Sequence, residues 1–497
     1  MRHIFCLKTL SVAIATFSVA SVASAAGLDR SGQDITAFLQ DGLYAEAVYT
    51  YIDADVTGND NAYVGTDNNA YTQGREIGDI AESYDFFRYG VKADINDTFS
   101  VGILYDEPFG AAADYSGNNN FVAQGNLDEA INIISNGNAS GLADAGAKIG
   151  QLTTAAMQAG AAAAALAQQA QNATTPEAAV GFAAQAKAAQ AQALELKGKA
   201  QSLGAAVASA QAEQATTGEG TNVEVRTESI TGILGAKFGA NKEFQVYGGP
   251  VAQQVQADVA LRGVAYGPAT GYTAHISSDQ AYGWLAGLAY SKPEIALKAA
   301  LTYRSEIDHS SSISETYPLV AALGGNPVQG GTIEITTPKS VNFDFQTGIN
   351  PTTLATAKVR WVPWSDFAIV PPLYNEVSKR STQDDKGLPL VGYDDDQWQV
   401  ELGLAKRLTP ALAVSGNVGW DSGAGNPVTS LGPIEGYYSA GLGAKYNVTE
   451  NWAVSAGGKY LWFGDAQGQI PTKKTVSDFE SNDGYIVGVK LSYQAAQ

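Results

Sequence analysis

About fourteen short segments of this chain alternate apolar and polar residues, and this alternation constrains the fold more than any other feature. Successive side chains of a β-strand point to opposite faces. In residues 87–95 (FRYGVKADI), Phe87 and Tyr89 therefore share one face and Arg88 lies on the other. A soluble sheet with one face on a core would alternate in the same way. In residues 452–462 (WAVSAGGKYLW), however, aromatic residues flank the apolar face, as in a lipid-facing band. The pattern predicts a transmembrane β-barrel.

The predicted fold class is all-β, an antiparallel barrel over residues 44–497 with an even number of strands, as in bacterial single-chain barrels. The strands are expected at residues 44–55, 83–95, 98–107, 223–238, 243–264, 279–291, 293–307, 336–349, 353–376, 391–406, 410–421, 434–446, 451–464 and 483–493. Short turns alternate with long loops, which places the turns and both termini in the periplasm. Residues 353–376 contain Pro363, Pro371 and Pro372, and we interpret them as one long bent strand, with two strands as the alternative.

The first 25 residues have the features of a signal peptide. Arg2 and Lys8 give a basic start, an apolar stretch follows, and residues 23–25 (ASA) have the small side chains of a cleavage site. We expect residues 1–25 to be removed together with Cys6, which leaves a mature chain without thiols or disulfides. No later stretch is apolar enough for a spanning helix. The predicted location is the bacterial outer membrane.

Charge excludes one class of partner. The chain has 50 acidic and 30 basic residues and a net charge of −20. Because phosphate binding requires a basic surface, nucleic acid is not an expected partner. The acidic run Asp394-Asp395-Asp396 could hold a divalent cation at the level of lipopolysaccharide, and the alternative is a solvated loop. We predict no cofactor and no metal site.

One segment departs from the β pattern. Residues 127–214, inside a predicted external loop at 108–222, are rich in alanine and glutamine, and alanine has the highest helix propensity. Thr175, Pro176 and Glu177 form a helix start, with Thr175 as the N-cap and Pro176 in the first helical position. We predict two long helices in an antiparallel hairpin. The alternative is a disordered loop of low complexity.

Three stretches resemble the FadL-type family of outer-membrane transporters for long-chain fatty acids and other hydrophobic compounds. They are FSVGILYDEPFGA at residues 99–111, WVPWSDF at 361–367 and GYYSAGLG at 436–443. The resemblance covers most of the barrel, and the run YDEPFG is its most distinctive part. It implies a fourteen-stranded barrel, an N-terminal plug in the lumen, a hydrophobic capture groove among the external loops, and sideways release through a kinked third strand.

Two departures from the family pattern affect these expectations. The plug segment, residues 26–43, is short and lacks an Asn-Pro-Ala type run, and the hairpin enlarges the external loop that follows the third strand. A further likeness concerns assembly, because residues 488–493 (GVKLSY) resemble the C-terminal signal read by the barrel assembly machinery. The expected partners are therefore a hydrophobic ligand, outer-membrane lipid and lipopolysaccharide, and that machinery.

Cations on the predicted inward faces could bind the carboxylate of a fatty acid, because a charge attracts its partner more strongly at low dielectric. They are Arg88, Lys92, Lys298, Arg304, Lys358 and Arg360. The alternative is that these side chains pair with Asp94, Asp344 or Glu401 across the lumen and only satisfy charge.

Pro108 and Gly110 are the candidates for a break in the third strand. Proline removes a donor from the ladder and glycine weakens a strand, so both should kink or end it. A break in the wall would open a path to lipid. The alternative is an ordinary strand end that enters a loop.

Two other functions compete with hydrophobe uptake. A general porin for polar solutes would have an open lumen lined by opposed charges. An enzyme would use His275 or His309, both in predicted external loops, and His309 stands between Asp308 and Ser310. Adjacent residues on a loop rarely adopt the geometry of a catalytic triad. We therefore predict a transporter and no enzyme.

Overall fold

The structure is a computed structural model that describes residues 28–62, 71–382 and 385–495. The predicted signal peptide lies outside the described residues. Among the helices of the described segments, none is both long and apolar enough to cross a membrane.

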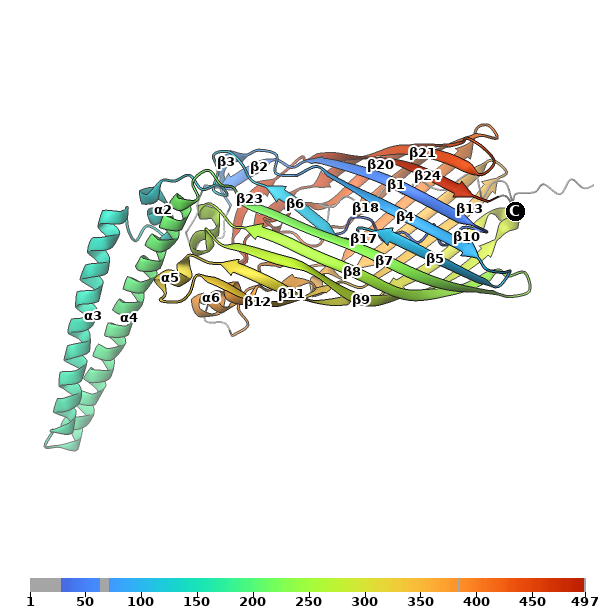
Figure 1. The fold of residues 1–497 in the computed structure, drawn as a ribbon. Helices are drawn as coiled ribbons and strands as arrows, with labels where there is room; N and C mark the ends of the chain where they lie inside the picture. The colour runs from blue at the N-terminus through green and yellow to red at the C-terminus, as the bar shows by residue number, and fades with distance from the viewer. Residues whose placement is uncertain (1–27, 63–70, 383–384, 496–497) are drawn as a thin grey trace, which may run out of the picture.

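A closed antiparallel barrel of fourteen strands forms the body of the molecule (Figure 1). The strands are β1 (Tyr44–Asp55), β4 (Tyr84–Asp94), β5 (Phe99–Asp106), β7 (Asn222–Phe238), β8 (Phe244–Ala260), β9 (Thr273–Lys292), β10 (Leu297–Arg304), β13 (Ser340–Asn350), β14 (Thr353–Val362), β17 (Gln397–Arg407), β18 (Leu412–Asp421), β20 (Glu435–Asn447), β21 (Trp452–Gly464) and β24 (Asp483–Gln494). The first and last strands pair from Tyr44↔Gln494 to Asp55↔Asp483, which closes the wall. The predicted fold class is confirmed.

The two faces of the wall separate as the alternation predicts. On β4 the side chains of Phe87, Tyr89 and Val91 are 42%, 45% and 53% exposed on the outside, whereas Arg88 and Lys92 are buried inside. An outer surface that leaves large apolar side chains exposed, with aromatics at its borders, fits lipid rather than water. The barrel is therefore an outer-membrane protein.

Three wall strands continue beyond the barrel at the end that carries the long loops, which we call the loop end. The added pieces are β6 (Gly110–Asp114), β11 (Ile307–Thr316) and β12 (Val328–Thr337). β11 and β12 form a hairpin where the sequence predicts only a loop. β9 also begins at Thr273, earlier than the predicted residue 279. These extensions expose serine, aspartate and glutamate on their outer face, so the lipid-facing pattern does not reveal them.

The prediction of one long strand at 353–376 is wrong. β14 ends at Val362, and the chain continues through η3 (Trp364–Asp366), β15 (Ala368–Ile369) and helix α6 (Pro372–Thr382). Pro363 cannot donate to the ladder. Trp364 is fully buried and packs edge-to-face against Phe109. The second half of the segment therefore covers the loop end instead of extending the wall.

The loop end is capped by a second sheet and by short helices. The five-stranded sheet contains β19 (Val428–Thr429), β22 (Ala466–Gln469), β23 (Thr475–Phe479), β2 (Gly58–Asn61) and β3 (Gln73–Ile77). Helix α6 and helix α5 (Leu319–Ala322) lie at the same end of the barrel, on the side of β11 and β12 (Figure 1). A further strand, β16 (Val391–Gly392), pairs with β15. One apolar core joins this cap to the loop end of the lumen.

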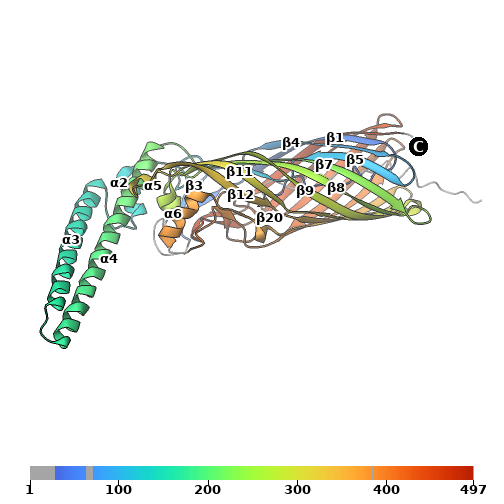
Figure 2. The same cartoon turned by 60° about the horizontal axis from the view of Figure 1, so that its bottom comes forward.

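The alanine-rich segment forms a helical hairpin that projects away from the barrel, as Figures 1 and 2 show from two sides. It consists of α3 (Leu142–Gln171) and α4 (Pro176–Ala215), preceded by a short helix, α2 (Leu127–Ile134). The Thr175 side chain accepts the Ala178 N–H at 3.3 Å, so the predicted N-cap is confirmed. The first long helix begins at residue 142 rather than near 127.

The base of the hairpin is fixed to the cap. α2 and the last turns of α4 share an apolar cluster with Val264 of the short helix η1 (Val264–Ala269). Near the end of α4, Glu213 is buried and accepts the Gln124 N–H at 2.7 Å. Burial raises the pKa of Glu213. The distal part of the hairpin contacts no wall strand (Figure 1).

Candidate functional site

Residues 28–43, which we call the N-terminal segment, lie inside the barrel, where the family resemblance implies a plug. Ile35 and Phe38 are fully buried. The Phe38 ring centroid lies 5.7 Å from that of Tyr247 on β8. A Cβ atom at Gly102 of β5 would lie 2.7 Å from the Phe38 ring, so glycine in the wall leaves room for the segment. The segment therefore occupies part of the lumen and packs against the wall.

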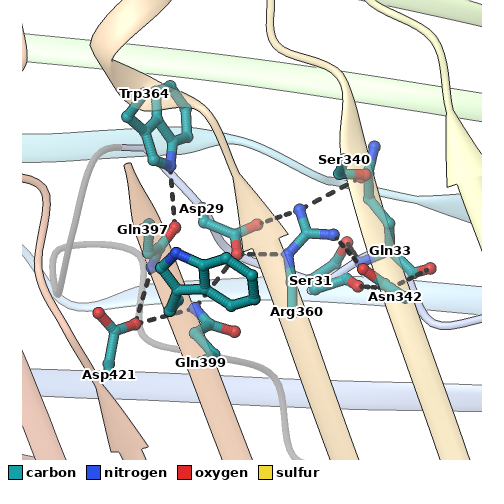
Figure 3. Close-up of polar contacts among 12 residues, drawn as sticks. Asp29, Ser31, Gln33, Ser340, Asn342, Arg360, Trp364, Gln397, Gln399 and Asp421 are labelled. Atoms are coloured by element: carbon teal, nitrogen blue, oxygen red, sulfur yellow. Dashed lines mark hydrogen bonds and ion pairs between the residues drawn. The ribbon is translucent and has the colours of Figure 1, made fainter. Parts of the chain in front are cut away.

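Asp29 anchors the start of this segment to the wall (Figure 3). Its two carboxylate oxygens accept hydrogen bonds from Arg360 Nε at 2.7 Å and Nη2 at 2.9 Å. Gln399 on β17 donates to the same carboxylate at 3.2 Å. Both members of the ion pair are buried, and such pairs hold best when their remaining groups are also bonded. Here Arg360 Nη1 donates to Asn342 at 2.7 Å.

Asp34 makes the second anchor. It lies 2.8 Å from Lys358 Nζ on β14 and 3.8 Å from Arg88 Nη1 on β4. Arg88 also lies 3.7 Å from Glu46 on β1. One aspartate of the segment thus connects opposite parts of the wall.

The other predicted cations have different partners. Lys92 pairs with Asp94 at 2.7 Å and donates to the carbonyl of Gly42. Lys298 donates to the carbonyl of Leu39. Arg304 donates to Thr231 Oγ1 at 3.2 Å, and within the described residues its Nε has no acceptor and no carboxylate oxygen lies within 4 Å.

Five of the six predicted cations therefore contact the N-terminal segment, and Arg304 does not. Of the partners named by sequence, Asp94 is the nearest carboxylate of Lys92 at 2.7 Å, Asp344 lies 3.7 Å from Lys358, and Glu401 pairs with Lys459. The nearer partners of Arg360 and Lys358, which are Asp29 and Asp34, were not anticipated. The sequence did contain one indication of this pairing, because the N-terminal segment carries acidic side chains and the predicted lumen is lined by cations.

The third strand is broken where Pro108 and Gly110 predict. β5 ends at Asp106 and β6 begins at Gly110. Pairing between β4 and β5 stops at Tyr89↔Tyr105, whereas β6 continues the ladder on β7. The outer half of β4 is thus separated from the third strand by a break in the ladder, which we call the wall gap.

The N-terminal segment closes this gap from inside. The Arg30 N–H donates to the carbonyl of Pro108 at 2.8 Å, and the Gly110 N–H donates to the carbonyl of Leu28 at 2.7 Å. Glu107 replaces part of the missing ladder, because its carboxylate accepts the Tyr84 hydroxyl at 2.8 Å and the backbone N–H of Phe87. The gap is therefore closed by side chains and by a short bridge, not by a continuous strand.

An apolar cleft begins beside the gap. It is partly open to solvent and is lined mainly by apolar side chains. Leu28, whose carbonyl accepts the Gly110 N–H, and Ala111, next to Gly110, line the cleft together with Leu431 and Ile434 of the cap. A space with these walls can hold an aliphatic or aromatic group.

A second cavity, also partly open to solvent, is lined in part by charged side chains. Asp34, Lys358, Arg360 and Glu401 line it beside the N-terminal segment. The lumen thus offers an apolar space toward the cap and a charged space beside the segment.

The residues weighed for catalysis and for metal binding lie elsewhere. His309 is in β11, not in a loop, and its Nε2 lies 3.1 Å from Gln253 Oε1 in the lumen, while Ser310 points outward. His275 is in β9 and pairs with Asp258 outside. Asp394 pairs with Lys473, and Asp396 accepts the Trp361 indole N–H at 3.1 Å. Across the described residues, no group of three or more histidine, cysteine or acidic side chains could hold a metal ion.

Comparison with known proteins places this architecture. No protein-family profile and no curated protein sequence matches the chain. Among solved structures, a Pseudomonas aeruginosa FadL homologue is similar with a TM-score of 0.55 and 13% identity, over 91% of this chain and 90% of that one. The chain has a FadL-type outer-membrane transporter fold. A deletion mutant of the monoaromatic hydrocarbon channel TodX is similar with a TM-score of 0.51 and 11% identity, over 96% of this chain and 100% of that one. The predicted FadL-type resemblance is thus confirmed at the level of the fold.

Proposed function

We propose that this protein takes up hydrophobic compounds, long-chain fatty acids among them, across the outer membrane. The external loops capture the ligand, the apolar cleft binds it, and the wall gap releases it sideways into lipid. One observation carries the proposal: the axial path contains the N-terminal segment, whereas the apolar cleft leads to the place where the wall ladder is broken.

The lumen cations have a defined part in this proposal. Five of them hold the N-terminal segment in the lumen, and their contacts with it break when the segment moves. They are Arg88, Lys92, Lys298, Lys358 and Arg360. Arg304 is the lumen cation that we propose as a ligand contact, because its Nε lacks an acceptor in the described residues. The proposed partners also include lipopolysaccharide around the loop end and the assembly machinery, which would read Gly488 to Tyr493 of β24.

A porin for polar solutes is the second candidate, and the polar cavity beside Asp34 supports it. The two functions differ in the kind of molecule that crosses the outer membrane. Cells that depend on this protein should take up palmitate and gain little permeability to small sugars, as measured by radiolabel uptake and by liposome swelling. Rapid sugar entry with palmitate uptake at the level of cells lacking the protein would establish the porin instead.

The route is tested separately. Replacing Pro108 and Gly110 together with threonine should favour a continuous third strand and slow palmitate uptake at an unchanged amount of barrel. Pro410→Thr, in a short turn at the opposite end, is the matched control. Unchanged uptake in the double variant would contradict lateral release.

A further inference from the structure

Arg30, a residue of the N-terminal segment, lies in the wall gap, and the contacts described so far do not account for its buried charge. Its side chain is 1% exposed. The guanidinium carbon lies 3.0 Å from the centroid of the Tyr84 ring on β4. On its other side lies Gly110, where any Cβ atom would overlap the guanidinium group. Arg30 therefore fills the space between the second and third strands.

The charge of Arg30 is poorly satisfied. Within the described residues, its Nε and Nη1 are buried without a hydrogen-bond acceptor, and no carboxylate oxygen lies within 4 Å. The nearby Glu107 carboxylate is engaged by Tyr84 and Phe87 instead. A buried cation without an anion is costly, and an aromatic ring compensates only part of that cost. The neighbouring residue Asp29 differs, because its carboxylate accepts hydrogen bonds from both Arg360 and Gln399.

Arg30 lies where an apolar surface meets a cation, an arrangement that complements an amphiphilic molecule. Leu28, two residues before Arg30, and Ala111, next to Gly110, line the apolar cleft. A molecule with its hydrocarbon tail in that cleft would bring its head group toward the gap. Among the described residues, the side-chain Nε–H and Nη1–H groups of Arg30 are donors at the gap without an acceptor, and such donors suit an anionic head group rather than a hydrocarbon.

We infer that Arg30 determines substrate specificity at the wall gap by pairing with the carboxylate of a hydrophobic acid as it leaves the cleft. This inference rests on the proposed uptake function. It adds the chemistry of the ligand head group and the residue that binds that head group. The incoming carboxylate supplies the anion that Arg30 lacks. Uncharged hydrophobes use the same cleft and gain nothing from the arginine.

The test measures binding of two ligands of equal chain length, palmitate and hexadecanol, to the purified full-length protein in detergent. Arg30→Met should weaken palmitate binding at least about tenfold and leave hexadecanol binding unchanged, because only the acid loses a charge-assisted contact. Arg30→Lys should restore most of the palmitate affinity. Arg226→Met is the matched control, since Arg226 lies 5.7 Å from the Tyr84 ring on the outer side and is already paired with Glu224. Resistance to heat-induced unfolding on gels verifies that each barrel is assembled.

Three results would overturn the inference. Equal loss of both ligands in Arg30→Met would mean that Arg30 only supports the wall. Discrimination lost in Arg304→Met but kept in Arg30→Met would place the head group in the lumen. Saturable binding of neither ligand to the unaltered protein would overturn the uptake proposal itself, and the inference with it.

Discussion

At the scale of single residues, the ion pair between Asp29 and Arg360 decides whether the N-terminal segment stays in place. Asp29→Asn would leave Arg360 buried without its anion, and loss of one partner from a buried pair costs about 3–5 kcal/mol. We expect the segment to detach more often and the barrel to conduct ions in frequent steps in planar bilayers. Asp41→Asn is the control, because Asp41 is half-exposed and its pair with Lys237 spans 3.6 Å. If the variant conducted ions no more often than the unaltered protein, other contacts would hold the segment in place.

The candidate site was predictable from sequence only in part. The inward cations follow from strand alternation, and each of the six is placed inside the barrel by its strand. Their partners were not predictable, because the N-terminal segment has no periodic pattern and Asp29 meets Arg360 across 331 positions of the chain. Arg30 was missed for the same reason, since only the three-dimensional structure brings it to Tyr84 and Gly110.

At the scale of elements, α6 is the helix that the sequence analysis missed, and a distant carboxylate explains why. Glu315 on β11 accepts the N–H groups of Leu373 and Tyr374 at 2.9 and 3.0 Å, so it caps the helix from another part of the chain. Local sequence offers only Pro371 and Pro372, which also suit a bent strand.

Loss of this cap should loosen α6. Glu315→Gln removes the negative charge at the helix start, which we expect to weaken the helix by about 1–2 kcal/mol. Hydrogen exchange across residues 372–382, followed by mass spectrometry, should become faster. Glu334→Gln changes an exposed glutamate on the adjacent β12 and should leave the exchange unchanged. Equal protection in both variants would mean that packing of Leu373 and Tyr374 suffices without the cap.

The helical hairpin was predictable because its signals are local: a long alanine-rich run and the start at Thr175. Since the hairpin contributes no wall strand, a barrel without residues 127–214 should still assemble and resist heat, as shown by its migration on gels before and after boiling. Replacing only residues 153–194 with the native turn sequence of 172–175 keeps the packed base and is the matched comparison. Failure of this shorter variant to assemble would show that the distal hairpin is needed for folding.

At the scale of the whole molecule, the alternation of short turns and long loops predicts the orientation in the membrane. With the loop end outside the cell, a protease added to intact cells should cut within residues 108–222, where the hairpin projects furthest, and should spare the turn at 449–451. Cutting at that turn without lysis would reverse the orientation. The number of strands was predictable because apolar and polar residues alternate along each wall strand. The cap is built from loop segments that lack this alternation, so its structure was not predictable.

The contacts of the N-terminal segment also govern the order in which the molecule can be completed. Asp29 and Asp34 are among the first residues of the described chain, yet their partners Arg360 and Lys358 follow 331 and 324 positions later. Contacts so far apart in sequence form slowly, because a long stretch of chain must be ordered first. Although the segment precedes every wall strand in the chain, its contacts with Arg360 and Lys358 can therefore form only after β14 has joined the sheet. Until then the barrel has an unfilled lumen and an unbridged third strand, so this segment completes both structures in a single late step.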